Sequence, residues 1–143
     1  MRLTYALCTP LDPMDELIAA ARRMQDRSYA PYSAYAVGAA IRTADGTVYT
    51  GCNIENANFS NSLHAEEVAL ASALKDGQRD FTAIAVSTAE RDSATPCGMC
   101  RQTLSEFSDG SLTVLCDAGD SVITYTLEEL LPESFSKELV LGR

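Results

Sequence analysis

The sequence predicts an α/β fold in which helices cover the faces of one sheet. The first supporting observation is the order of the periodic segments, which alternate along the chain as α-β-β-α-β-α-β-β-α. The second is length, because 143 residues fit one domain, residues 1–143, and can bury a continuous core without disulfide staples. The third is composition: 46% hydrophobic and 22% charged residues are ordinary values for a globular protein.

The N-terminal half is predicted to contribute a helix and a β-hairpin. Asp12 is a candidate N-cap before a proline at the first helical position, and an apolar face continues this helix to about Arg27 or Ser28. Strands at 37–43 and 48–52 flank the turn 44–47, which is a hairpin signal. The polar segment 53–63 is predicted to be a loop, and a loop of that length in a small domain is usually functional.

The C-terminal half is predicted to alternate helices with strands. Residues 64–76 are rich in Ala, Leu and Glu and precede Gly77, a good C-terminal cap, which predicts a second helix. A buried strand at 81–88 follows, and a third helix opens at 96–98 and runs to about Phe107. The remaining elements are strands at 112–116 and 122–126 and a short helix at 127–131, stopped by Pro132.

Charge and hydropathy limit the classes of partner. The formal net charge of −9 would repel a polyanionic ligand, and the one Lys/Arg cluster, Arg22-Arg23, lies on a predicted helix, so nucleic acid is not expected as a partner. The longest uncharged run, residues 28–41, is too short and too polar to span a bilayer. The first residues carry no signal-peptide pattern. We therefore expect a soluble cytoplasmic protein without a membrane partner.

The cysteines divide into two groups. Five is an odd number, and the absence of a regular spacing favours a reducing compartment over a disulfide framework. Cys97 and Cys100 have the spacing of metal ligands. Cys8, Cys52 and Cys116 do not, and they are interpreted as small buried hydrophobes.

Two short motifs carry the candidate chemistry: His64-Ala65-Glu66, and the later Pro96-Cys97-Gly98-Met99-Cys100. A structural zinc site is closed by four protein ligands, whereas a hydrolytic site keeps three and leaves the fourth position for water. His64 and the two cysteines make three ligands, and Glu66 is left to move protons. Each motif opens a predicted helix, whose N-terminal partial charge favours thiolate over thiol.

Each motif taken alone has other interpretations. His64 is the one histidine in the chain, and an isolated histidine is more often a core or surface residue than a ligand. A Cys-x-x-Cys pair also occurs in redox dithiols and zinc knuckles. The joint pattern resembles the signature of zinc-dependent nucleobase deaminases.

Most of the chain resembles the short-form cytidine deaminases. Five blocks are similar to that family in order and spacing: residues 29–40, 51–60, 64–70, 96–107 and 130–135. The resemblance implies a three-layer α/β/α fold with a mixed five-stranded sheet and a homotetrameric assembly. It also implies hydrolytic deamination of cytidine and deoxycytidine in pyrimidine salvage.

The resemblance assigns Zn²⁺ as cofactor, with His64, Cys97 and Cys100 as ligands and Glu66 as proton shuttle. In this chemistry, zinc lowers the pKa of water toward about 7, and the glutamate moves a proton from water to N3 of the ring and then to the departing amine.

Five further residues occupy positions with a family role in substrate binding. The resemblance implies that Asn53 and Glu55 hold the ribose hydroxyls and that Ala65 offers main-chain groups to the pyrimidine. Tyr35 takes an aromatic position usually filled by Phe, and Phe135 takes the position whose ring enters a neighbouring subunit's pocket. Without the resemblance, each of these residues has an ordinary structural interpretation.

Two departures from the short-form pattern are mutually consistent. Members of the family usually have Cys at the position of His64 and Arg at the position of Glu67. Three thiolates on Zn²⁺ sum to −1, which an Arg can offset, whereas one neutral His and two thiolates sum to zero. Arg101 is a candidate to donate to a ligand sulfur from outside the ligand set, and the alternative is a surface helix residue.

Several alternatives stay open at this level. Related substrates are a cytosine nucleotide, free cytosine or a cytosine-containing antibiotic nucleoside, although the segment near Asn53 has no cation for phosphate and free base would leave Asn53 and Glu55 unused. A non-catalytic zinc-binding module has no use for Glu66. An RNA- or DNA-editing deaminase is opposed by the net charge of −9.

Overall fold

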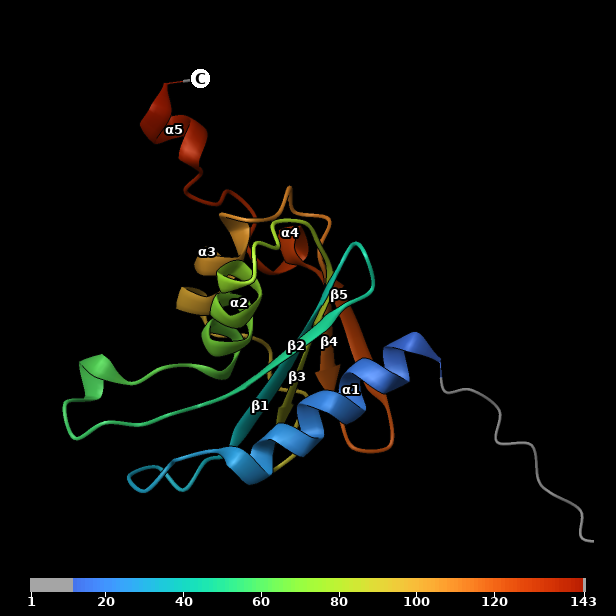
Figure 1. Cartoon of the computed structure of the whole chain (residues 1–143), viewed down its shortest axis with the longest axis vertical. Coiled ribbons are helices and arrows are strands. Elements are labelled where there is room, and N and C mark those ends of the chain that lie inside the picture. The colour runs from blue at the N-terminus through green and yellow to red at the C-terminus, as the bar shows by residue number, and fades with distance from the viewer. Residues whose placement is uncertain (1–11, 143) are drawn as a thin grey trace, which may run out of the picture.

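A mixed five-stranded sheet forms the centre of the computed structural model, which describes residues 12–142 (Figure 1). Its order is β2-β1-β3-β4-β5. Strands β3 and β4 pair in parallel, and the other neighbours pair antiparallel. The strands are β1 (Val37–Thr43), β2 (Val48–Cys52), β3 (Phe81–Thr88), β4 (Thr113–Asp117) and β5 (Val122–Thr126).

Helices cover both faces of this sheet, which confirms the predicted three-layer α/β/α fold (Figure 1). Side chains alternate across a strand, and in β1 Ile41 joins the core under α2 whereas Ala40 joins the core under α1. One face carries α1 (Pro13–Met24), and the other carries α2 (Ala65–Lys75), α3 (Gly98–Ser105) and α4 (Leu127–Leu130).

Local signals explain where the helices begin and end. The Asp12 side chain accepts a hydrogen bond from the Met14 N–H at 2.8 Å, which caps α1. The chain then continues as a 3₁₀ turn at Gln25–Arg27, so the predicted helix reaches its expected end with a tighter last turn. Helix α2 ends at Lys75, before Gly77 with a φ of 89°.

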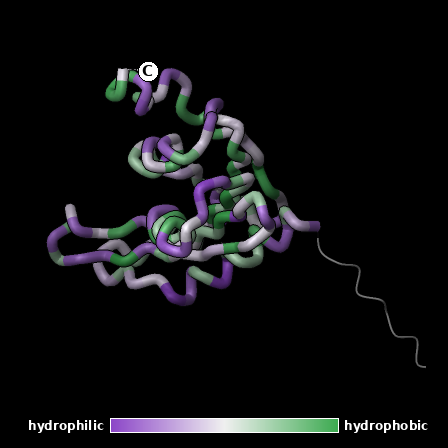
Figure 2. The backbone as a smooth tube through the Cα atoms, turned by 45° about the horizontal axis from the view of Figure 1, so that its top comes forward, coloured by the Kyte–Doolittle hydropathy of each residue, from purple (hydrophilic) through white to green (hydrophobic). Residues whose placement is uncertain are grey.

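The C-terminal segment departs from the sequence prediction. A further helix, α5 (Lys137–Leu141), was not predicted, and it projects away from the sheet (Figure 1). Figure 2 shows hydrophobic residues in this terminal part, and Leu139, Val140 and Leu141 are each more than 60% exposed. Five residues span little more than one helical turn, which is too short for periodicity to reveal.

The cysteines outside the metal motif behave as predicted where they are described. Cys116 and Cys52 are buried and free, and Cys8 lies outside the described residues. Within residues 12–142, no helix is long and apolar enough to cross a membrane.

Candidate active site

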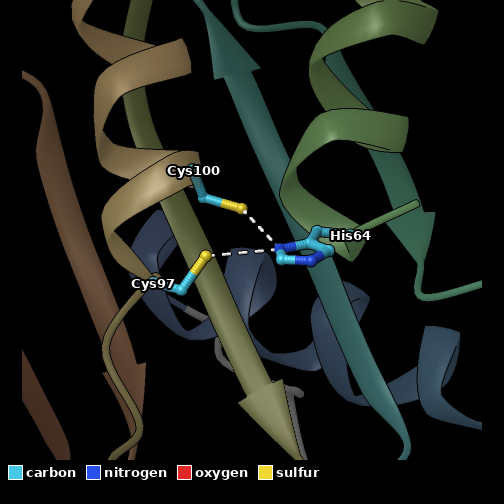
Figure 3. A group of neighbouring side chains, drawn as sticks. All are labelled: His64, Cys97 and Cys100. Carbon is cyan, nitrogen blue, oxygen red and sulfur yellow. Dashed lines mark hydrogen bonds between the residues drawn. The ribbon is translucent and has the colours of Figure 1, made fainter. Parts of the chain in front are cut away.

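Three side chains from two helix starts converge on one point (Figure 3). The Nδ1 atom of His64 lies 3.2 Å from the Cys100 Sγ and 3.3 Å from the Cys97 Sγ. The candidate ligand atoms all lie within 4.8 Å of one another. Zinc bonds of about 2.0 Å to nitrogen and about 2.3 Å to sulfur give tetrahedral edges of roughly 3.5 Å. The cluster therefore fits a zinc ion held by one imidazole and two thiolates.

The backbone explains this convergence. His64 is the N-cap of α2, Cys97 is the N-cap of α3, and Cys100 lies in the first turn of α3. The Glu67 carboxylate accepts the His64 N–H at 3.1 Å, which fixes the start of α2. The candidate ligands therefore lie at helix N-termini, as predicted, and the partial positive charge at the start of α3 favours thiolate over thiol at Cys97 and Cys100.

Glu66 lies beside the cluster and is almost fully buried, with 6% of its surface exposed. Burial raises the pKa of its carboxyl, and this effect outweighs the opposing hydrogen bond to its own backbone. Burial and the charge of Glu66 also raise the pKa of the Cys100 thiol. A cation at the cluster reverses this preference, because a coordinated thiol is deprotonated.

The cluster opens into a pocket of about 480 Å³. The pocket is lined by most of the residues that the sequence analysis singled out: Tyr35, Asn53, Glu55, His64, Ala65, Glu66 and Cys97. Further lining residues were not predicted, and they include Ser33, Val37, Val86, Thr88, Ala94 and Thr95. Within residues 12–142, no lysine or arginine lines this pocket, and two of the lining residues, Glu55 and Glu66, carry carboxylates.

Most hydrogen-bonding groups of the Asn53 side chain bind other groups of the protein. Its Oδ1 accepts hydrogen bonds from the Ser28 hydroxyl and from the Val37 N–H, the latter at 2.8 Å. Its Nδ2 donates to the Tyr35 carbonyl at 2.8 Å. An amide nitrogen has two N–H groups, and within the described chain the second one has no protein acceptor. Asn53 therefore joins two segments and keeps one donor for a ligand.

Glu55 is held by the turn that precedes β1. Its Oε2 accepts the N–H groups of Tyr32 and Ser33 at 2.8 and 3.2 Å, and its Oε1 accepts the Ser33 hydroxyl. The hydrogen bond from the Ser33 hydroxyl lowers the pKa of Glu55. Glu55 therefore presents an ionised carboxylate at neutral pH.

Arg101 and Phe135 lie outside the pocket lining of the described residues. The Arg101 guanidinium donates three hydrogen bonds: to the Pro96 carbonyl at 2.7 Å, the Leu130 carbonyl at 2.8 Å and the Thr95 hydroxyl at 2.6 Å. The guanidinium thus fixes the segment before Cys97, and none of these bonds goes to a sulfur. Phe135 is 66% exposed on the C-terminal segment.

Comparisons with known proteins agree with this geometry. The family model for the cytidine and deoxycytidylate deaminase zinc-binding region matches residues 12–116. The chain is 42% identical over 126 residues to a cytidine deaminase of Sporosarcina psychrophila, covering 87% of this chain and 93% of that one. It is 34% identical over 109 residues to a blasticidin-S deaminase of Bacillus cereus, covering 71% and 77%. A crystal structure of cytidine deaminase from Burkholderia pseudomallei superimposes with a TM-score of 0.81 at 41% identity, covering 85% and 98%.

Proposed function

The chain belongs to the cytidine and deoxycytidylate deaminase zinc-binding family, and from this premise we propose that it deaminates cytidine and deoxycytidine. The products are uridine or deoxyuridine and ammonia, as in pyrimidine salvage. One observation carries the proposal: a buried carboxylate, Glu66, adjoins a three-ligand zinc cluster inside a pocket that also contains Asn53 and Glu55.

His64, Cys97 and Cys100 would hold the zinc ion, which would supply a Lewis acid that makes water acidic enough to lose a proton near neutral pH. Glu66 accepts that proton at a carboxylate oxygen and delivers it to N3 of the ring, which activates C4 for attack by the water oxygen. C4 then carries both the hydroxyl and the amine. Glu66 takes the hydroxyl proton and passes it to the amine, the C4–N bond breaks, and ammonia leaves. The carboxylate ends each cycle in its starting form.

Asn53 and Glu55 would hold the sugar. After the contacts within the protein are counted, Asn53 keeps one N–H donor and Glu55 keeps an acceptor position. A hydroxyl group can use both, because it accepts one hydrogen bond and donates another. Ala65 would offer its main chain to the pyrimidine edge, and Tyr35, which also lines the pocket, would provide an aromatic side chain.

Other substrates are less compatible with the pocket. A nucleotide phosphate would meet carboxylates and, in the part of the chain described here, no lysine or arginine in the lining. Free cytosine would leave the donor of Asn53 and the acceptor of Glu55 unused. An antibiotic nucleoside is the second candidate, because the chain is also similar to a blasticidin-S deaminase.

A homotetramer is part of the proposal. Its support is the exposed apolar surface of the C-terminal segment, where Phe135 is 66% exposed and residues 139–141 of α5 are 62–69% exposed. A surface of this kind is typical of an interaction site. A reducing cytoplasm suits the chain, because Cys97 and Cys100 are free thiols that must stay reduced to bind metal.

The decisive test follows the ultraviolet absorbance of cytidine mixed with the zinc-loaded protein, because deamination changes the ring chromophore. A steady decline that Glu66→Gln abolishes, with zinc retained, is the expected result. No change with zinc present contradicts cytidine as substrate. A parallel assay with blasticidin S ranks the second candidate.

A further inference from the structure

We propose that Ser33 is a positioning residue for sugar recognition, because its hydroxyl fixes the carboxylate of Glu55 in the pocket. The inference rests on the proposed function, which supplies the sugar. The Ser33 Oγ donates to Oε1 of Glu55, a residue 22 positions further along the chain. Ser33 and Glu55 both line the pocket that contains His64 and Glu66.

The Ser33 hydroxyl has a defined orientation. A serine hydroxyl rotates freely unless its oxygen is also engaged as an acceptor. The Ser33 Oγ accepts the N–H of Tyr35 at 3.1 Å, so its single proton is directed elsewhere. That proton points at Glu55, which makes the contact a hydrogen bond to a charged acceptor, a class stronger than neutral ones.

This one hydroxyl fixes the second oxygen of the carboxylate. The N–H groups of Tyr32 and Ser33 both bind Oε2, and two bonds to one oxygen leave the carboxylate free to pivot about that atom. Within residues 12–142, the Ser33 hydroxyl is the one protein donor to Oε1. A carboxylate has about four acceptor positions, so the turn fills three and leaves one on Oε1. The direction of that remaining position depends on Ser33.

The turn that presents Ser33 is itself constrained. Ala34 has a φ of 55°, a conformation that residues other than glycine rarely adopt, and its N–H binds the Ala30 carbonyl at 3.0 Å. Such conformations persist where the surrounding structure holds them, often at binding sites. The turn is therefore set before a ligand arrives.

The test compares Ser33→Ala with Ser33→Thr, which restores the hydroxyl, and with Ser62→Ala. Ser62 is a matched control, because its hydroxyl accepts the Asn56 N–H at 3.2 Å in the neighbouring loop, and the hydrogen bonds of the Glu55 carboxylate in the described chain go to Tyr32 and Ser33. The readouts are kcat and KM for cytidine and the inhibition constants of uridine and 2′,3′-dideoxyuridine. The second inhibitor lacks the sugar hydroxyls that Glu55 would bind.

We expect Ser33→Ala to raise the KM for cytidine and the inhibition constant of uridine by about five- to twentyfold, which is less than the direct loss of a hydrogen bond to a charged group because Ser33 acts through Glu55. Its kcat and its affinity for 2′,3′-dideoxyuridine should stay within about twofold, since only sugar recognition is changed. Ser33→Thr should recover most of the loss, and Ser62→Ala should resemble the wild type. In a Glu55→Gln background, Ser33→Ala should add little.

An equal loss for both inhibitors, an unchanged KM for cytidine, or additive effects of Ser33→Ala and Glu55→Gln would overturn the role of Ser33. The proposed function fails separately. A wild-type protein that neither converts cytidine nor binds uridine contradicts that function and this inference together. Normal wild-type turnover with a normal Ser33→Ala variant contradicts the inference alone.

Discussion

Replacing Gly51 by alanine tests how the zinc ligand His64 is held. Gly51 lies in β2, where the strand passes directly beneath the first turns of α2. A Cβ at this position would lie 2.3 Å from the Ala65 carbonyl oxygen and 2.5 Å from the Ala69 nitrogen. Ordinary non-bonded contact begins near about 3.5 Å, so the start of α2 must move by about 1 Å to admit one methyl group.

That displacement is large on the scale of metal coordination. Zinc–ligand distances are fixed to within about 0.2 Å. His64 directly precedes Ala65 at the start of α2, whereas the two cysteines lie at the start of α3, Cys97 as its N-cap and Cys100 in its first turn. Overpacking of this kind costs about 1–3 kcal/mol of folding stability. We expect Gly51→Ala to lower the free energy of unfolding by that amount. We also expect zinc binding to weaken at least about tenfold, which corresponds to about 1.4 kcal/mol.

Gly38→Ala is the matched control. A Cβ at Gly38 would lie 2.0 Å from the Ala21 carbonyl oxygen of α1, on the opposite face of the sheet from the zinc cluster. Gly38→Ala should lower the free energy of unfolding about as much as Gly51→Ala does, and it should leave the zinc affinity near the wild-type value. Urea unfolding measures stability, and competition with a chromophoric chelator measures zinc affinity. The reasoning is refuted if Gly51→Ala binds zinc normally, or if Gly38→Ala loses as much affinity.

Three other perturbations have defined outcomes. Glu66→Gln should keep one zinc per chain by metal analysis while kcat falls at least about 100-fold, and substantial residual turnover would exclude Glu66 as the proton shuttle. Burial alone would raise the pKa of Asp117, but hydrogen bonds from Arg22 and Ser87 outweigh it and lower the pKa to about 2. A lowered pKa contributes stability that is present above the unfolded value near 3.8 and is lost as pH falls toward 2. Urea unfolding should therefore show that the free energy of unfolding of the wild type falls by about 2 kcal/mol more than that of Asp117→Asn over this pH range. Equal decreases would contradict the lowered pKa of Asp117. Removal of zinc by a chelator should lower the thermal midpoint, because zinc at about 1,000 times its dissociation constant adds about 4 kcal/mol; a midpoint that does not move, or that magnesium restores, argues against a zinc site.

The elements most accurately predicted are those with strong local signals. The bounds of β1, β2, β3 and β5 coincide with the predicted ranges, and β4 is shifted by one residue. Turn residues and β-branched content indicate such strands without tertiary information. The order β2-β1-β3-β4-β5 is different in kind, because the pairing of β3 with β4 depends on contacts far apart in the chain. The family resemblance implied a mixed five-stranded sheet, and the order of its strands was not predicted from the sequence.

Some residues of the candidate site could likewise be predicted from local sequence, and others could not. The zinc ligands could be predicted, because the spacing of Cys97 and Cys100 within one helical turn already places two sulfurs together, and His64 completes the set. The contact of Ser33 with Glu55 could not, since it depends on how the turn before β1 meets the loop after β2. Arg101 shows the same limit, because its hydrogen-bond partners include the Leu130 carbonyl, which no local pattern connects to it.

Glu67 takes a position at which the short-form resemblance implies an arginine, and in this chain it pairs with the backbone of His64. An arginine at the position of Glu67 is useful when three thiolates leave an excess negative charge on the metal, and one imidazole with two thiolates removes that need. Glu67 is then available for a different task, and it accepts the His64 N–H at 3.1 Å to cap α2. Its charge also has a chemical effect: beyond the main contribution of burial, Glu67 raises the pKa of the Glu66 carboxyl. Glu67 therefore stabilises the start of the helix that carries His64.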